Sequence, residues 1–218
     1  MERIILVLGG ARSGKSMFAE RLAREMNSRF KPLRDIAYIA TATATDDEFR
    51  RRIDVHRERR SGIYQTIEEP IGIAAALGGA FSSHGVFLLE CITTWLGNLF
   101  FQRKDDPIEQ VAATMIDDIA VRWGKDPASV NKEDDGFFER LLIAERGDYT
   151  YPIKELLKNH SEQDKFLIAV ANELGQGIVP ADAMTRNYRD IHGRIVQKLA
   201  DIADYVFYLV AGVPIRLK

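Results

Sequence analysis

Residues 4–16 hold the pattern that most constrains what this chain can fold into. An apolar, β-branched run, Ile4–Leu8, leads into a segment of the form Gly-x-x-x-x-Gly-Lys-Ser, and apolar positions at helical spacing follow from Met17 to about Met26. This order predicts a strand, a phosphate-binding loop and a helix. The residues of the loop are Gly9, Gly10, Ala11, Arg12, Ser13, Gly14, Lys15 and Ser16.

This loop predicts a binding site for a nucleoside triphosphate. Its glycines let successive backbone N–H groups face one anion, and the N-terminal end of the following helix adds positive charge. We expect Lys15 to neutralise the β- and γ-phosphates and the Ser16 hydroxyl to bind Mg²⁺. A plain glycine turn between a strand and a helix is the weaker interpretation, because four fixed positions at this spacing seldom occur together by chance.

Composition and charge narrow the class of protein. The chain has 218 residues, of which 46% are hydrophobic and 28% charged, so it can bury a core without a structural metal. Its formal net charge of -2 does not favour nucleic acid or an anionic membrane as a partner. A single cysteine, Cys91, excludes an intramolecular disulfide and is most simply a small core residue. Without a signal-peptide pattern or a run long enough to span a membrane, we expect a cytoplasmic protein.

Predicted strands and helices alternate along the sequence. This alternation favours a single α/β domain over residues 1–218, with a mostly parallel sheet covered by helices on both faces. The predicted strands are residues 4–8, 36–41, 63–67, 86–90, 166–171, 205–210 and 215–217. The predicted helices are residues 17–26, 45–60, 71–77 (closed by Gly78 and Gly79), 93–101, 107–123, 137–144, 152–158 and 186–202.

In an open parallel sheet, ligands bind beyond the carboxyl ends of the strands. This rule selects the phosphate loop, Thr41, Glu90 and the pair Asn172-Glu173. Glu90 ends a buried strand as a Walker-B carboxylate does, so we expect it to hold Mg²⁺ or its water, or to accept a substrate hydroxyl proton. Its alternative role is to cap the helix that follows.

The predicted helix at residues 45–60 carries six arginines and one histidine, His56. Charge runs of this kind usually form a solvated face. His56, however, follows Phe49 by seven residues and Ile53 by three, which places it on their inward-facing stripe. It is either a structural residue or, as a neutral imidazole beside arginines, a nucleophile toward a phosphate.

Six stretches occur here as a set: the phosphate loop, residues 38–41, residues 46–48 with His56 beyond them, residues 88–94, residues 172–180 and residues 189–194. Together they resemble the bifunctional adenosylcobinamide kinase / adenosylcobinamide-phosphate guanylyltransferase family of cobalamin biosynthesis. Leu-Glu-Cys-Ile-Thr-Thr and Asn-Glu-x-Gly-x-Gly-Ile-Val-Pro are the most specific of these motifs. The resemblance covers residues 3–101 and 165–218.

The resemblance implies a RecA-like P-loop fold and a homotrimer whose subunits share nucleotide sites. It implies an enzyme that phosphorylates adenosylcobinamide with a nucleoside triphosphate, ATP or GTP. GMP from GTP is then transferred to that phosphate through a GMP–histidine intermediate, and His56 occupies the histidine's position. His56, Lys15 and Glu90 are thus the expected catalytic residues. The implied nucleotide contacts beyond the phosphate loop are Ile39, Ala40, Thr41, Arg57, Glu58, Arg59, Arg60, Glu68 and Glu90.

Two departures bear on this assignment. Residues of about 104–164 find little counterpart apart from the predicted helix at 107–123, which indicates a helical insertion. Val55 stands where some relatives have a second histidine. Two alternatives therefore stay open: a P-loop small-molecule kinase without the transferase step, and a RecA-like nucleotide-driven switch. The near-neutral charge offers little support for a switch that acts on nucleic acid.

Overall fold

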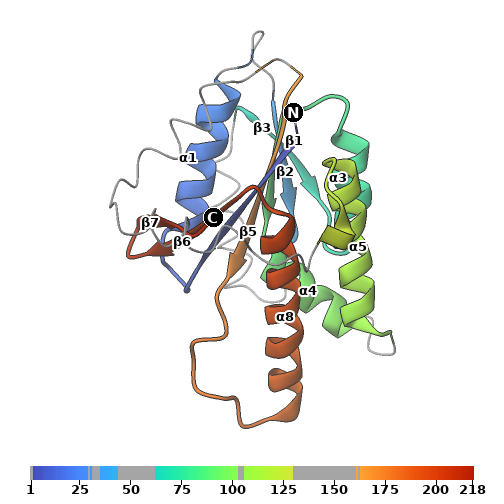
Figure 1. Ribbon diagram of the computed structural model, residues 1–218, viewed down its shortest axis with the longest axis vertical. Coiled ribbons are helices and arrows are strands. Elements are labelled where there is room, and N and C mark those ends of the chain that lie inside the picture. Colours follow the sequence, from blue (N-terminus) through green and yellow to red (C-terminus); the bar gives the residue numbers. More distant parts are fainter. Residues whose placement is uncertain are drawn as a thin grey trace.

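A seven-stranded sheet runs through the centre of the computed structural model, which describes residues 2–28, 30, 35–43, 62–102, 106–129, 161 and 163–218 (Figure 1). The strand order is β3-β2-β4-β5-β1-β6-β7, and only the β6–β7 pair is antiparallel. The strands are β1 (Glu2–Gly9), β2 (Ile36–Ala40), β3 (Tyr64–Glu68), β4 (Val86–Glu90), β5 (Lys165–Asn172), β6 (Tyr205–Val210) and β7 (Val213–Arg216).

Helices cover both faces of the sheet, as the alternating pattern predicts. Helix α1 (Lys15–Asn27) lies on one face (Figure 1). The opposite face is covered by α3 (Ile73–Ala80), α4 (Ile92–Gln102), α5 (Ile108–Arg122) and α8 (Ala183–Ile202). This is the α/β P-loop fold, with a mostly parallel sheet covered on both faces, that the sequence pattern predicts. Among the described helices, none has both the length and the apolar character needed to cross a membrane.

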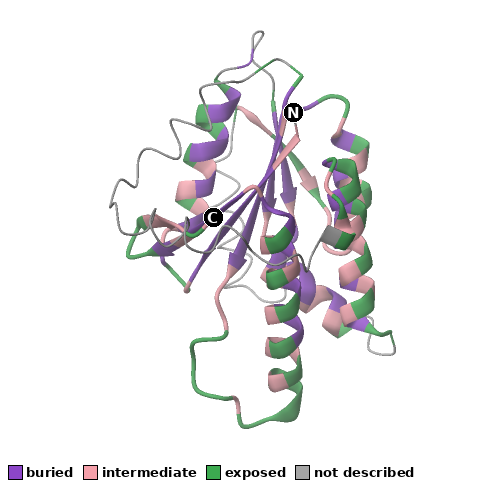
Figure 2. Ribbon diagram, viewed as in Figure 1, coloured by how far each residue is buried: buried purple, intermediate pink, exposed green. Residues whose placement is uncertain are grey.

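The two faces of β1 pack against different helix layers. Ile5 and Val7 belong to the core beneath α1, whereas Ile4 and Leu6 belong to the core beneath the other four helices. Successive strand side chains point to opposite faces, so a strand covered on both sides must be apolar throughout. Figure 2 shows the central strands buried along most of their length. This double burial explains why the central strands read as unbroken apolar runs.

Helix α3 corrects one expectation, because it continues through Gly78 and Gly79 instead of ending before them. A Cβ at Gly78 would lie 2.8 Å from Nη2 of Arg122 on α5. The Arg122 guanidinium also lies 5.9 Å from the centre of the Phe81 ring. The glycine therefore permits a close approach between two helices, a role that residue spacing alone does not distinguish from a helix stop.

Two further boundaries differ from expectation. Helix α8 begins at Ala183, before the predicted start at 186, because the Asp182 side chain accepts a 2.8 Å hydrogen bond from the backbone N–H of Thr185. Strand β7 covers Val213–Arg216 and includes Pro214, which an edge strand tolerates. The helices predicted at 45–60, 137–144 and 152–158 lie outside the described residues.

Candidate nucleotide site at the carboxyl edge of the sheet

The phosphate loop joins the end of β1 to α1 in a strongly bent conformation. Arg12 and Gly14 have positive φ angles of 58° and 94°. At Gly9, a Cβ would lie 2.6 Å from the carbonyl oxygen of Leu209 on β6, so only glycine fits there. The loop is also tied to the β6–β7 turn, since the N–H of Gly212 donates to the Ser13 carbonyl at 2.9 Å. The glycine-rich segment is thus held as a rigid turn at the start of a helix, as an anion site requires.

Lys15 lies within this loop with only 7% of its surface exposed. Its Nζ donates a 2.6 Å hydrogen bond to the carbonyl oxygen of Gly10. Burial lowers the pKa of Lys15, and electrostatic interactions with Cys91 and Glu90 oppose that shift. A buried lysine with one backbone partner is well placed to gain from a bound polyphosphate.

Glu90 meets the phosphate loop directly, which confirms the expectation that the two lie side by side. The Ser16 hydroxyl donates to Oε1 of Glu90, and the Tyr38 hydroxyl donates to Oε2 at 2.7 Å. β5 lies between β1 and β4 in the sheet and is parallel to both. The carboxyl ends of β1 and β4 therefore lie at the same edge of the sheet. Glu90 therefore bonds to the loop and to β2, and the alternative of a helix-capping carboxylate does not describe these contacts.

The oxygens gathered here suit Mg²⁺. This ion takes oxygen ligands and is usually held by one or two carboxylates together with waters and substrate phosphates. Ser16 and Glu90 supply a hydroxyl and a carboxylate, and the buried Ser13 hydroxyl has no hydrogen-bond partner among the described residues. No group of three or more His, Cys, Asp or Glu side chains in the described ranges forms a metal site without substrate. The donor set thus fits a nucleotide-bound magnesium and not a structural metal.

Thr41 fixes the loop that follows Glu90. Its Oγ1 accepts from the N–H of Cys91 at 2.8 Å and donates to the Cys91 carbonyl at 2.9 Å, and its own N–H donates to the Glu90 carbonyl. Of the other predicted contacts, Ile39 has its side chain in the core, and Glu68 is exposed at the end of the edge strand β3. Ala40 is half-buried at the end of β2.

The predicted nucleophile and the four predicted nucleotide contacts that follow it lie outside the described residues. The residues concerned are His56, Arg57, Glu58, Arg59 and Arg60. Their roles stay predictions, and the described part of the site contains the phosphate loop, Thr41 and Glu90.

A second hydrogen-bonded group lies where β5 ends, and it includes the pair Asn172-Glu173 that the strand-end rule selects. Thr93 Oγ1 accepts from the N–H of Asn172 at 2.8 Å and lies 3.0 Å from Nε2 of His192 on α8. The N–H of Glu173 donates to the Gly9 carbonyl at 2.9 Å, so the end of β5 is anchored to the phosphate loop as well. His192 precedes Ile195 by three residues on the buried stripe of α8, and it lies within the stretch 189–194 that supports the family resemblance.

Acid is expected to destabilise the fold through His192. Burial lowers its pKa from 6.5 to about 4, although Glu173 opposes the shift. The unfolded chain takes up this proton near its ordinary pKa and the folded chain only near the lowered one, so stability falls as the pH drops between the two. At about pH 5 the loss is roughly 2 kcal/mol relative to neutral pH.

Urea unfolding at about pH 7.5 and about pH 5 measures this loss, with His192→Gln as the comparison. The variant lacks the titrating ring, so its stability should fall by less on acidification than that of the original chain. Equal losses in both proteins would contradict the assignment.

Residues 5–217 match the model of the CobU family, described as cobinamide kinase / cobinamide phosphate guanyltransferase. The chain belongs to this family. The "Bifunctional adenosylcobalamin biosynthesis protein CobP" of Pseudomonas aeruginosa is 35% identical over 213 residues, which cover 98% of this chain and 96% of that protein. Two proteins named "Bifunctional adenosylcobalamin biosynthesis protein CobU" are similar to it as well. The one from Escherichia coli is 33% identical and the one from Salmonella typhimurium 34%, each with 99% of both chains covered.

The family is one of enzymes with a kinase and a guanylyltransferase activity, and the resemblance drawn from the motifs is confirmed. Among solved structures, a KaiC-like protein, PH0186 from Pyrococcus horikoshii OT3, gives a TM-score of 0.40 at 11% identity. The aligned part covers 94% of this chain and 70% of PH0186. A likeness this distant supports no conclusion about this chain.

Proposed function

We propose that this protein catalyses both reactions of its family. It phosphorylates the aminopropanol hydroxyl of adenosylcobinamide with ATP or GTP, and it then transfers GMP from GTP to that phosphate, giving adenosylcobinamide-GDP. The observation that carries the proposal is the family match over residues 5–217. The contact of Ser16 with Glu90 supports it, because it joins a phosphate loop to a carboxylate suited to orient a hydroxyl.

In the kinase reaction, Lys15 and the N–H groups of the phosphate loop bind the triphosphate and offset the charge on the transferring γ-phosphoryl group. Glu90 accepts a hydrogen bond from the substrate hydroxyl and orients it toward the γ-phosphorus. Tyr38 holds the second oxygen of that carboxylate, which restricts its rotation. Ser16 and Glu90 would hold Mg²⁺, which would supply additional neutralisation of phosphate charge.

In the transfer reaction, neutral His56 attacks the α-phosphorus of GTP. A P–N bond forms, the bond to the bridging oxygen breaks, and pyrophosphate leaves. The phosphate of the corrinoid then displaces His56, which restores the free imidazole. Two displacements replace one difficult reaction between two polyanions. The arginine-rich stretch 57–60 stabilises the charge of the departing group.

We further propose a cytoplasmic homotrimer formed from a single P-loop domain, in which residues of about 104–164 are a helical insertion. These points rest on the family resemblance and on the sequence pattern of the insertion. The near-neutral charge of the chain supports a small-molecule substrate over a nucleic acid.

Incubation with Mg²⁺ and GTP labelled at the α-phosphate tests the transferase half. We expect a stoichiometric label on the protein that is acid-labile and alkali-stable and that maps to the peptide containing His56. Cobinamide phosphate should then remove the label and appear as labelled cobinamide-GDP.

Two other results would contradict the proposed bifunctional activity. An active kinase that never acquires the label would be a small-molecule kinase without the transferase step. Nucleotide hydrolysis stimulated by a macromolecule, with no small acceptor modified, would identify a nucleotide-driven switch.

A further inference from the structure

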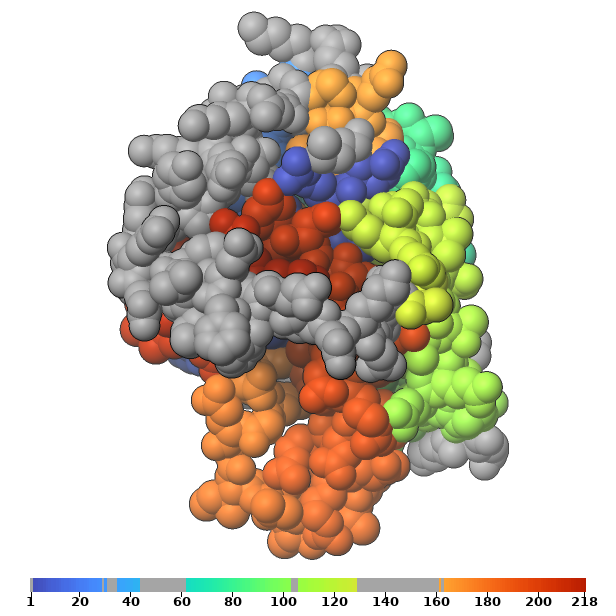
Figure 3. All heavy atoms as spheres, in the orientation of Figure 1, coloured from blue at the N-terminus to red at the C-terminus, as the bar shows by residue number. Residues whose placement is uncertain are grey.

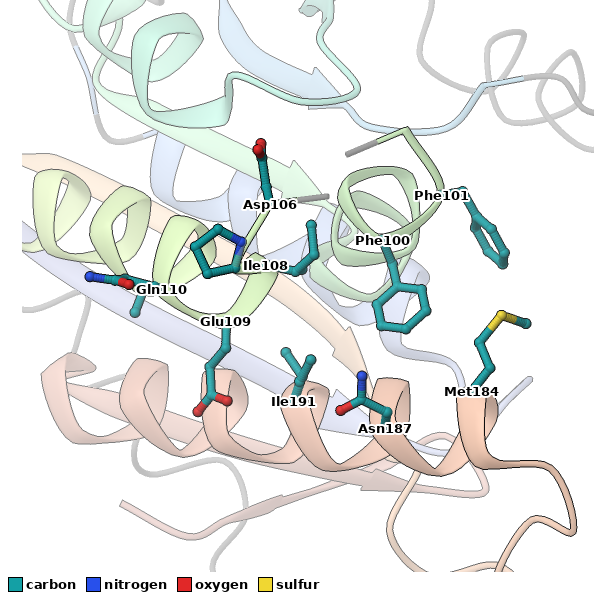
Figure 4. A pocket seen from close by; sticks show the side chains of 11 residues that line it. Phe100, Phe101, Asp106, Ile108, Glu109, Gln110, Met184, Asn187 and Ile191 are labelled. Atoms are coloured by element: carbon teal, nitrogen blue, oxygen red, sulfur yellow. The ribbon is translucent and has the colours of Figure 1, made fainter. Parts of the chain in front are cut away.

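A long groove lies between α4, α5 and the start of α8, outside the phosphate loop. It consists of two adjoining hollows of about 880 Å³ and about 420 Å³, which share the side chains of Phe100, Phe101 and Met184. In Figure 4, Met184 and Asn187 rise from α8 toward the two phenylalanines of α4. Both hollows fall in the range of small-molecule sites, and together they suit a ligand larger than a nucleotide. We call this region the α4–α8 groove.

The inner end of the α4–α8 groove is hydrogen-bonded to the loop that carries Glu90. Thr94 and Asn98 line the smaller hollow. The Asn98 amide donates to the Thr41 carbonyl at 2.7 Å, and the Thr94 hydroxyl lies 3.0 Å from Sγ of Cys91. Cys91 follows Glu90 directly in the chain, so these contacts connect the wall of the groove to the end of β4.

The lining of the groove combines apolar and polar features. Phe101 and Met184 are apolar, yet 61% and 55% of their surface is exposed to solvent. Neighbouring apolar side chains exposed in this way usually mark a binding surface. The amides of Asn98, Asn187 and Gln110 line the walls, and the carboxylates of Asp106 and Glu109 lie at the outer end. Glu109 also pairs with Arg194.

These features match the chemistry of one substrate. Adenosylcobinamide is a broad, rigid macrocycle with apolar faces and a rim of primary amides, and it carries a net positive charge because the ring and the adenosyl ligand only partly neutralise Co(III). Aromatic and thioether side chains suit its faces, amides suit its rim, and carboxylates suit its charge.

We propose that the α4–α8 groove binds the corrinoid ring of the substrate, with the aminopropanol arm directed past Thr94 toward Glu90. The proposal rests on the proposed function and assigns that function's acceptor to a defined surface. The start of α8 projects beyond the sheet together with the loop before it (Figures 1 and 3), and the side chains of α8 form one wall of this site. The nucleotide occupies the phosphate loop on the other side of Glu90.

The test replaces the two exposed apolar side chains together, Phe101→Ser and Met184→Ser. Adenosylcobinamide is the probe, first in equilibrium dialysis and then as acceptor in the kinase assay at saturating ATP. We expect the Kd and the KM for cobinamide to rise about tenfold or more, while the KM for ATP changes by less than about twofold. A control with Val121→Ser and Leu217→Ser removes side chains of similar exposure, 65% and 46%, away from the groove and should change neither value.

The outcomes separate the two proposals. If the original chain phosphorylates cobinamide but the groove variant keeps its KM and Kd, the groove assignment is wrong and the proposed function stands. If the variant keeps its affinity for cobinamide and instead changes the molar mass in light scattering, the groove is an interface between copies. If the original chain neither binds nor phosphorylates cobinamide, both proposals fail together.

Discussion

Replacing His56 by alanine is expected to abolish GMP transfer while leaving most of the phosphorylation of cobinamide intact. The two reactions need different groups in this proposal: the kinase step uses Lys15 and Glu90, whereas the transferase step requires a nucleophile that forms a bond to GMP. Removal of a covalent nucleophile commonly lowers a rate by about 10⁴-fold or more. Radiolabelled products separated by chromatography report both activities in one reaction mixture.

A second histidine variant provides the control. His160→Ala changes a residue for which no catalytic role is predicted, so it should keep both activities. The division of labour would be disproved by a His56→Ala protein that loses both reactions to the same extent while its thermal unfolding is unchanged.

Lys15→Ala is expected to impair both reactions, in contrast to His56→Ala. The Lys15 ammonium is buried in the phosphate loop and bonds to the Gly10 carbonyl, so its removal takes away positive charge where the polyphosphate binds. Loss of a single group of this kind lowers kcat/KM by about 10²–10³-fold. Initial rates at several nucleotide concentrations give this value for each reaction.

Lys198→Ala is the matched control, because Lys198 is also partly buried and forms a 2.8 Å ion pair with Asp117 on α5, far along the chain from the loop. It should retain full activity. A Lys15→Ala protein that unfolds at the normal temperature and keeps its kcat/KM would remove the phosphate loop from the mechanism.

Most elements of the sheet were predictable because their signals are local. The buried strand at 86–90 and the strand at 205–210 have the predicted bounds, since a continuous apolar run fits a strand covered on both faces. The ends of the other elements were less predictable. Gly78 illustrates why: its helix continues to Ala80, and the Arg122 guanidinium, 44 positions later in the chain, lies where a side chain at Gly78 would be. Asp182 starts α8 early through a single cap.

In the candidate site, too, local features were predictable from the sequence and contacts between distant residues were not. The phosphate loop was predicted in full, because its glycines, lysine and serine act within eight consecutive residues. The contact between Ser16 and Glu90 joins residues 74 positions apart, and Thr93 and His192 lie 99 positions apart. Such pairs depend on which strands become neighbours and on how the helices cover them.

The sequence by itself determined the fold class, the phosphate loop and the family, because backbone bending, burial on two faces and short motifs are properties of neighbouring residues. Tertiary structure alone decided that Tyr38 holds Glu90, that Thr93 joins β5 to α8, and that side chains of α4 and α8 line one groove. The physical reason is that these contacts follow from strand order and helix packing, which arise only when amphipathic elements distant in sequence bury their apolar faces together.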